Sequence, residues 1–309
     1  MSLPVAAVIV TYNSAKEIDK CLDSLQNVAE VVVVDNASSD PTPGLAAKRG
    51  PRVRVVVNGE NRGFAAAANQ GVRATVSPLV LFLNPDAVLA TGLEEMVEEL
   101  QAGGAGAAGG RLIDAKGDTQ IGFNIRKFPT PAGLVAEALL VNRLWPSNPL
   151  NRRYRCLDLD HTRPQDVEQP AGAFLMVRRD VLEALGGWDD RFYPLWFEDV
   201  DLCRRIRQAG YRIRYVPACA ARHRGAHSLA RISLEDRQVY WYGSLLSYTG
   251  KHFSVAARWL VRAAVALGAV LRFVASIGRS EERRSYRRVM VLALGRRTVE
   301  TQVQPHVLT

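Results

Sequence analysis

The sequence predicts an α/β protein with a Rossmann-like, mixed but mainly parallel β-sheet, helices on both faces, and amphipathic helices at the C-terminal end. Short apolar runs rich in β-branched residues alternate with stretches whose apolar residues recur at helical spacing. Strands that are apolar throughout are typical of a parallel sheet covered on both faces. At 309 residues the chain is long enough to bury a large core, so we expect it to fold without disulfides.

The predicted elements follow one another regularly in the first third of the chain. The first strand is expected in PVAAVIVTY, residues 4–12, and the first helix in NSAKEIDKCLDSLQ directly after it. The next three strands are expected to end at Asp35, near Asn58 and at Asn84. After about Gly110 loops and short elements replace this alternation. A strand, two helices and a last strand are then expected between residues 169 and 217.

The positive charge of the chain is concentrated at its C-terminal end. The formal net charge is +9, and from Tyr240 onward eleven Lys and Arg residues stand against three Glu residues, a balance of +8. The rest of the chain is nearly neutral, which argues against a nucleic-acid-binding protein. The four cysteines show no CxxC pair, and the N-terminus lacks the layout of a signal peptide. We therefore expect free thiols in a reducing, cytoplasmic compartment.

Polar residues follow each predicted strand, at the edge where ligands bind in sheets of this kind. Asp35 and Asn36 could accept the N–H of a base or a ribose hydroxyl, or they could form an Asx turn. The stretch ENRGFAAAANQG places Gly63 at a helix start, where a ligand could meet free N–H groups. Alanine-rich helices also pack closely for structural reasons, so both interpretations stay open.

The stretch LVLFLNPDA raises the question of whether Asp86 makes a turn or holds a cation. A Pro-containing turn with Asp86 as a helix cap is the simpler interpretation. A divalent cation is the alternative, because Mg²⁺ typically takes one or two protein carboxylates and fills its other positions with phosphate oxygens and water. His223 and His227 follow the last strand and could either coordinate a metal or be ordinary surface residues.

A second acidic group, Glu198 and Asp199, stands at the start of a predicted helix. Acidic residues there complement the helix dipole. Aromatic residues precede them and suggest a platform for a sugar or an acceptor, which favours a catalytic carboxylate. These aromatic residues are Phe192, Tyr193, Trp196 and Phe197.

Taken together and in this order, seven stretches resemble the inverting glycosyltransferases of family 2 with the GT-A fold, and above all their bacterial rhamnosyltransferase-like branch. The stretches are VIVTYN, VVVVDNASSD, NRGFAAAANQG, LFLNPDA, GAFLMVRRDVLEALGGWDDRFY, FEDVDLCRR and HRGAHS, within about residues 4–228. The resemblance implies a dTDP- or UDP-sugar donor, bound Mg²⁺ or Mn²⁺, and a glycan or polyprenyl-linked acceptor in cell-wall or surface-polysaccharide assembly. We expect a GT-A domain over residues 1–235, with a nucleotide-binding half at about 1–110 and an acceptor half at about 111–235.

The resemblance also implies roles for single residues. The base and ribose would be held by Thr11, Tyr12, Asn13, Asp35 and Asn36. Asn61 and Gly63 would border the diphosphate. Asp86 would hold the metal as the last acid of the family's D-x-D motif, with help from His223, while Asn84 stands where that motif has its first acid. Asp199, which forms the family's ED pair with Glu198, would be the general base, and the metal would stabilise the departing diphosphate on the other side of the sugar.

Residues 236–309 are predicted to form a basic amphipathic helical tail. Its arginines alternate with Trp, Leu, Val and Phe at helical spacing, and its longest charge-free stretch, around Ala263 to Leu271, is far shorter than the ~20 apolar residues that cross a bilayer. Such helices suit an anionic surface, although packing on the catalytic domain or on a partner subunit is the alternative. We expect peripheral contact with the cytoplasmic face of the cell membrane, and a homo-oligomer stays open.

Two other functions share parts of this pattern. A nucleotidyltransferase that uses an NTP and Mg²⁺ would ordinarily have a Gly-rich, basic loop after the first strand, where this chain reads TYNSAKE. A dehydrogenase would have GxGxxG at that place. A non-catalytic sugar-nucleotide-binding protein is the second alternative, because Asn84 weakens the metal motif. If Asp199→Asn lost transfer activity but still bound the donor, this result would argue against a non-catalytic binding protein.

Overall fold

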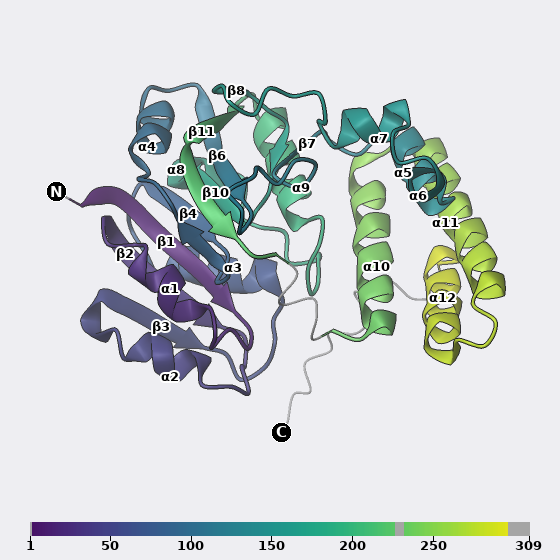
Figure 1. Ribbon diagram of the computed structural model, residues 1–309, viewed down its shortest axis with the longest axis horizontal. Helices are drawn as coiled ribbons and strands as arrows, with labels where there is room; N and C mark the ends of the chain where they lie inside the picture. Colours follow the sequence, from purple (N-terminus) through teal and green to yellow (C-terminus); the bar gives the residue numbers. More distant parts are fainter. Residues whose placement is uncertain (1, 226–231, 296–309) are drawn as a thin grey trace. The chain divides into compact units, whose positions relative to one another are not determined.

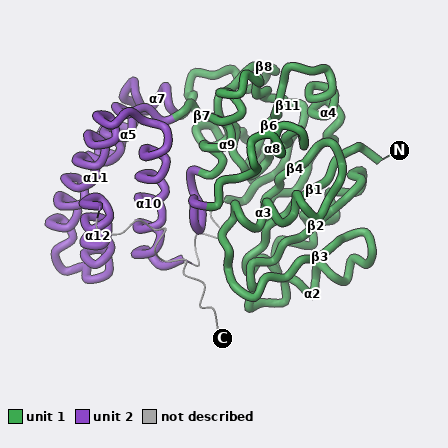
Figure 2. Tube along the Cα trace, turned by 180° about the vertical axis from the view of Figure 1, so that it is seen from behind, with its two compact units in different colours: residues 1–128, 155–190, 198–228 green, residues 129–154, 191–197, 229–309 purple. Residues whose placement is uncertain are grey.

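The computed structural model describes residues 2–225 and 232–295, which form two compact units. Unit 1 comprises residues 1–128, 155–190 and 198–228, and unit 2 comprises residues 129–154, 191–197 and 229–309 (Figure 2). Unit 2 thus includes two segments that the sequence analysis assigned to the acceptor half. The domain boundary at residue 235 stays a prediction.

Unit 1 is built on a nine-stranded sheet in the order β3-β2-β1-β4-β10-β6-β11-β5, with β8 paired to β11 (Figure 1). Its strands are β1 Leu3–Thr11, β2 Val28–Asp35, β3 Val53–Val57, β4 Leu79–Leu83, β5 Ala87–Leu89, β6 Ala105–Ile113, β8 Gln165–Asp166, β10 Phe174–Arg178 and β11 Arg212–His223. Strands β3, β2, β1 and β4 are parallel, β10 is antiparallel to both β4 and β6, and β6 is parallel to β11. Six strands therefore end at one edge of the sheet, the carboxyl edge.

Helices cover both faces of this sheet, as the uninterrupted apolar strands predict. In β4, Leu79, Leu81 and Leu83 face one core, and Val80 and Phe82 face the other. The first core includes residues of α1, α2 and α4, and the second includes residues of α3, α8 and α9. These helices are α1 Ile18–Asp23, α2 Thr42–Ala47, α3 Phe64–Arg73, α4 Glu94–Gln101, α8 Arg179–Ala184 and α9 Glu198–Gln208. The predicted α/β fold class is confirmed.

A few shorter elements complete unit 1. The strands β7 (Ile125–Arg126) and β9 (Gln169–Pro170) pair in a small second sheet. A 3-10 helix spans Gly50–Arg52 before β3. The small sheet matters for the site, because β9 leads into the loop that precedes β10.

Unit 2 is helical and includes the helices predicted in the tail. Its helices are α5 Pro131–Ala138, α6 Val141–Leu144, α7 Pro149–Tyr154, α10 Leu234–His252, α11 Val255–Ala275 and α12 Ser280–Ala293. Ser233 and Ser254 cap α10 and α11, since their hydroxyls accept the N–H groups of Asp236 (3.0 Å) and Ala257 (3.4 Å). None of the helices in the described residues is long and apolar enough to cross a membrane.

Candidate active site

Strands β1 and β2 bring Thr11 and Asp35 together at the carboxyl edge. The two residues are register partners and are fully buried, and Thr11 Oγ1 donates to Asp35 Oδ2 at 2.8 Å. The backbone N–H of Ser38 donates to Asp35 Oδ1 (2.8 Å), and its hydroxyl donates to Oδ2 (2.5 Å). A carboxylate offers about four acceptor positions. Three of them are used within the protein, so Asp35 orders the loop after β2 and keeps one acceptor position on Oδ1.

Asn13 joins the loops that follow β1 and β2. It adopts a positive φ of 56°, and its Oδ1 accepts the backbone N–H groups of Ser39 (2.7 Å) and Asp40 (3.2 Å). Asparagine tolerates this conformation better than most residues. Tyr12, directly before it, is exposed. The two loops therefore form one hydrogen-bonded surface with an open aromatic ring.

The third part of the edge is the start of helix α3. Asn36 Nδ2 donates to Gly63 O at 3.1 Å, and Gly63 N donates to Asn61 Oδ1 at 2.9 Å. Gly63 has a φ of 78°, which a side chain would strain. It precedes α3, whose N-terminus has no side-chain cap. The first N–H groups of α3 thus form a favourable position for an anion.

Asp86 and His223 meet because β5 pairs with β11, so that Ala87 lies opposite His223. Asp86 Oδ1 and His223 Nε2 are 3.5 Å apart, and both side chains are more than nine-tenths buried. Burial raises the pKa of Asp86, but the hydrogen bond and charge of His223 lower it further, so that this pKa lies below its usual value. Asp86 is therefore a carboxylate at neutral pH.

Gln120 and Phe123 hold the imidazole of His223 in place. Gln120 Nε2 donates to His223 O (2.6 Å), and its Oε1 faces His223 Nδ1 at 3.1 Å. The Phe123 ring stacks on the imidazole at 5.3 Å with an interplanar angle of 8°. Since Gln120 Oε1 is an acceptor, His223 Nδ1 carries a proton, and Nε2 faces Asp86.

These contacts fit a divalent cation between Asp86 and His223. Without a proton or a cation, a carboxylate oxygen and an imidazole lone pair would face each other as two acceptors. Within residues 2–225 and 232–295, no group of three or more His, Cys, Asp or Glu side chains is arranged so that it could hold a metal ion by itself. A site with two protein ligands suits Mg²⁺ or Mn²⁺ when phosphate oxygens and water supply the other positions. His227 lies outside the described residues.

Asp199 is held by three N–H groups at the start of α9. Its Oδ2 accepts from Gln169 Nε2 and from the backbone N–H of Gly172, both at 3.0 Å, and its Oδ1 accepts from Val200 N at 2.8 Å. Since a carboxylate offers about four acceptor positions, one position on Oδ1 is not used by these three donors.

The neighbouring Glu198 differs from Asp199 in its environment. Its Oε2 is buried and has no hydrogen-bond partner. Burial and the charge of Asp199 raise the pKa of Glu198 well above its usual value. The two acids are therefore distinct: Asp199 is oriented by donors, and Glu198 favours the neutral form.

The two-residue segment Gly172–Ala173 connects the two acidic centres. Gly172 N donates to Asp199, and Ala173 O accepts the N–H of Asn84 at 3.0 Å. Asn84 is two residues before Asp86, and its own carbonyl accepts the N–H of Ala87 at 3.0 Å. The turn that carries Asp86 and the helix start that carries Asp199 therefore lie at the same edge of the sheet.

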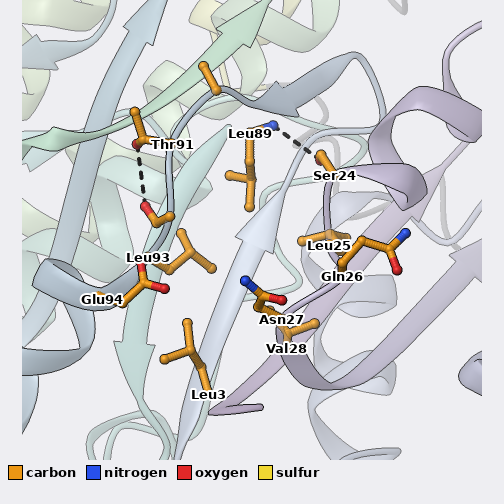
Figure 3. Close-up of a pocket in the computed structure, with 12 residues that line it drawn as sticks. Leu3, Ser24, Leu25, Gln26, Asn27, Val28, Leu89, Thr91, Leu93 and Glu94 are labelled. Carbon is orange, nitrogen blue, oxygen red and sulfur yellow. Dashed lines mark hydrogen bonds between the residues drawn. The ribbon is translucent and has the colours of Figure 1, made fainter. Parts of the chain in front are cut away.

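Two further features lie outside this edge. A cavity of about 340 Å³ borders Leu3 and Val28, the first residues of β1 and β2, and so lies at the opposite end of these strands (Figure 3). Phe192 and Phe197 are buried in unit 2, where Phe197 lies 5.4 Å from the ring of Tyr248. The prediction that these two rings belong to an open platform is wrong, because their faces are used for packing.

The structure also shows site residues that the sequence analysis missed. They are Ser38, Gln120, Phe123, Gln169 and Gly172. Each is a single residue in a loop or a short strand, with no local pattern that marks it. The stretch QPAGAF shows a glycine near a strand start, but its contact with Asp199 depends on the tertiary fold.

The fold of this chain is that of solved GT-A glycosyltransferases. The mannosyltransferase PcManGT from Pyrobaculum calidifontis, in complex with GDP-Man and Mn²⁺, superposes with a TM-score of 0.55 at 17% identity, over 98% of this chain and 88% of that one. GalNAc-T7, solved with UDP, GalNAc and Mn²⁺, superposes with a TM-score of 0.59 at 14% identity, over 98% of this chain and 57% of that one. The class of the protein is thus an α/β protein with the GT-A fold.

The sequence comparisons identify the family. The sequence model of glycosyl transferase family 2 matches residues 6–186, and that of glycosyl transferase family group 2 matches residues 157–289. The N-acetylglucosaminyl-diphospho-decaprenol L-rhamnosyltransferase of Mycobacterium tuberculosis (strain CDC 1551 / Oshkosh) is 30% identical over 95% of this chain and 98% of its own length. Rhamnosyltransferase WbbL of Escherichia coli (strain K12) is 26% identical over 55% of this chain and 61% of its own length. The chain belongs to glycosyl transferase family 2 and is a glycosyltransferase, which confirms the resemblance seen in its motifs.

Proposed function

We propose that this glycosyltransferase moves a sugar, rhamnose or a similar hexose, from a nucleotide-diphosphate donor to a hydroxyl of a glycan or lipid-linked acceptor, with inversion at the anomeric carbon. The observation that carries the proposal is the pairing of two acidic centres at one edge of the sheet. Asp199 is held as a base at α9, and Asp86 faces His223 beside it, with the Gly172–Ala173 peptide in contact with both segments. An inverting transfer needs these two centres.

The donor nucleotide would lie along the first three strand ends. Tyr12 offers an exposed ring for the base, and Asp35 keeps one acceptor position for an N–H or a hydroxyl. The same region includes Thr11, Asn13 and Asn36, which order the two loops. The diphosphate would meet the uncapped N-terminus of α3 beside Asn61 and Gly63.

The departing diphosphate would be stabilised next to Asp86. This residue and His223 would hold Mg²⁺ or Mn²⁺, which would supply Lewis-acid stabilisation of the charge on the leaving group. Asn84 adds no charge, so the diphosphate itself would supply much of the coordination. Gln120 keeps His223 Nε2 directed toward Asp86.

The acceptor would approach Asp199. Its hydroxyl donates to the remaining acceptor position of Oδ1, and Asp199 takes the proton as the oxygen attacks the anomeric carbon. General base catalysis of this kind contributes typically about 10²- to 10⁴-fold. Glu198 does not share this role, because its raised pKa favours the neutral acid.

The names of the relatives support a lipid-linked acceptor and a rhamnosyl donor. The relative that matches nearly the whole chain is an L-rhamnosyltransferase named for a diphospho-decaprenol substrate. We propose that this chain works in cell-wall or surface-polysaccharide assembly. It would act at the cytoplasmic face of the membrane, with its C-terminal helices in peripheral contact.

A thermal-shift panel with nucleotide-diphosphate sugars, with and without Mn²⁺, tests the proposal. A donor that binds only the folded state raises the midpoint by mass action. We expect a shift with dTDP-rhamnose or a UDP-sugar that depends on Mn²⁺ and is lost in Asp86→Ala. Asp199→Asn should keep this shift and lose transfer by at least about 10²-fold. The exposed Glu183→Gln on α8 serves as the control and should match the wild type. A shift with free triphosphates alone would instead favour a nucleotidyltransferase.

A further inference from the structure

One side of helix α11 is apolar and exposed along its whole length. The residues of this α11 apolar face are Ala256, Trp259, Leu260, Ala263, Leu267, Val270, Leu271, Val274 and, just beyond the helix end, Ile277. Successive members are one, three or four positions apart, and at about 100° per residue all of them fall within an arc of about 120°. Trp259 is 61% exposed and Leu267 is 53% exposed. The face is therefore one continuous stripe.

The opposite side of α11 is already packed within unit 2. There Val261, Val265 and Ala269 are buried, and α11 packs against α5, α10 and α12. Arg272 donates to Ala138 O at 2.5 Å, and Arg262 donates to Ala293 O at 3.1 Å. These arginines are used to satisfy the last carbonyl groups of α5 and α12. The exposed stripe is thus a second apolar surface of the same helix.

The charge of unit 2 indicates what covers the stripe. By sequence, unit 2 has seventeen Lys and Arg residues against six Asp and Glu, a net charge of +11. Unit 1 has twenty-three against twenty-five, a net charge of −2. The guanidinium of Arg283 lies over the ring of Phe273 at 4.5 Å, on the flank of the stripe. A second copy of the chain would place +11 against +11, whereas an anionic bilayer complements both the charge and the apolar stripe.

We propose that the α11 apolar face is a docking surface for an anionic lipid bilayer. The helix lies along the boundary between head groups and acyl chains, with its aliphatic side chains in the acyl region and the flanking Arg283 at the lipid phosphates. Trp259 suits the interfacial level, where an indole ring combines apolar area with a polar N–H. This docking surface extends the proposed function, and its biological role rests on that function. A lipid-linked acceptor would be presented at the same membrane surface to which the helix binds.

Vesicle sedimentation of the full-length chain at low salt tests this surface. With vesicles of phosphatidylglycerol and phosphatidylcholine we expect binding that weakens with added salt and with neutral phosphatidylcholine alone. The double variant Leu267→Ser with Leu271→Ser should bind at least about tenfold more weakly, because each leucine loses its burial in the acyl region. The control is Val76→Ser, which removes an exposed apolar side chain from unit 1 and should bind like the wild type.

A second measurement covers the case in which the double variant does not fold. Brominated lipids should quench the tryptophan fluorescence of the bound protein, and Trp259→Phe should lose part of this quenching. No binding of the wild type to anionic vesicles, or equal binding of the double variant, overturns the inference. A dimer of the wild type in analytical ultracentrifugation that the double variant abolishes, without vesicle binding, overturns it in favour of self-association.

The same preparations separate this inference from the proposed function. Release of nucleoside diphosphate with a short soluble acceptor does not require a bilayer. Activity without vesicle binding would overturn only the docking surface. Vesicle binding without transfer to any acceptor would overturn only the proposed function.

Discussion

Replacement of Gly172 by alanine tests whether the position of Asp199 controls the rate of transfer. A Cβ at Gly172 would lie 3.0 Å from Asp199 Cβ and 3.5 Å from its Oδ2. The backbone N–H of Gly172 also donates to this carboxylate at 3.0 Å. The new methyl group would thus press on the side chain that the same residue holds. Since carbon atoms pack best at about 3.5–4.0 Å, Asp199 or the backbone must shift by roughly 0.5–1 Å.

A shift of this size predicts a moderate loss of kcat. A misplacement of about 1 Å can cost on the order of 10²-fold in rate. For about half that displacement we expect kcat to fall by about tenfold, which corresponds to about 1.4 kcal/mol in the barrier. The KM for the donor should stay close to the wild-type value, because the proposed nucleotide site lies along the ends of β1, β2 and β3 and not at Gly172.

Steady-state release of nucleoside diphosphate at saturating acceptor measures both parameters. The matched control is Gly44→Ala in α2, where an added Cβ meets no atom within 4 Å. A kcat of Gly172→Ala within twofold of the wild type, with a native circular dichroism spectrum, would refute the argument that Asp199 needs this position. A rise in donor KM at constant kcat would do the same.

Further predictions concern metal binding and acid stability. In calorimetry with nucleoside diphosphate present, Gln120→Leu should weaken Mn²⁺ binding by about 10- to 100-fold, because the variant no longer holds the imidazole of His223 in place. The control Gln101→Leu, at the exposed end of α4, should bind Mn²⁺ like the wild type. Unchanged Mn²⁺ affinity would contradict this role. Burial raises the pKa of Glu30, but the hydrogen bonds from Ser77 lower it further, so the folded pKa is below the usual value. Its stabilisation is therefore present above the unfolded pKa and is lost as the pH falls through the folded pKa. In urea unfolding, Glu30→Ala should have a lower free energy of unfolding than the wild type at pH 7, and this difference should become smaller as the pH is lowered to 3. A difference that does not change with pH would contradict this role of Glu30.

The first half of the sheet could be predicted from the sequence because its strands are buried on both faces. The predicted strand at residues 4–12 is observed at Leu3–Thr11, and the predicted ends at Asp35 and Asn84 lie at or directly after the ends of β2 and β4. Such strands read as uninterrupted apolar runs, so their ends are visible as the first polar residues. Because parallel strands end at the same edge of the sheet, the polar residues that follow them lie together there. The position of the candidate site could therefore be predicted from the strand ends.

The second half could not be predicted in the same detail, because its positions depend on pairing between distant segments. Strand β10 is inserted antiparallel between β4 and β6, and β5 is a three-residue strand that pairs with β11. No local pattern specifies either pairing. The contacts of Gln120 with His223 and of Gly172 with Asp199 follow from these pairings, so these two partners were missed.

The pairing of β5 with β11 would also allow a chain with Asn84 in place of an acid to use a metal as proposed. The protein would contribute one carboxylate, Asp86, and one imidazole, His223, whose facing atoms are 3.5 Å apart. One negative charge does not neutralise a divalent cation, so the diphosphate of the donor must supply the rest. Metal and nucleotide should therefore bind cooperatively, and by thermodynamic linkage each should tighten the other by the same factor.

Calorimetric titration of Mn²⁺ with and without UDP or dTDP measures this coupling directly. We expect about 5- to 150-fold tighter Mn²⁺ binding when the nucleotide is present, after correction for Mn²⁺ bound by free nucleotide. Asn84→Asp should raise the affinity for Mn²⁺ alone and reduce the coupling, because the second carboxylate replaces part of the charge that the diphosphate supplies. Equal Mn²⁺ affinity with and without nucleotide would mean that Asp86 and His223 do not share their cation with the donor.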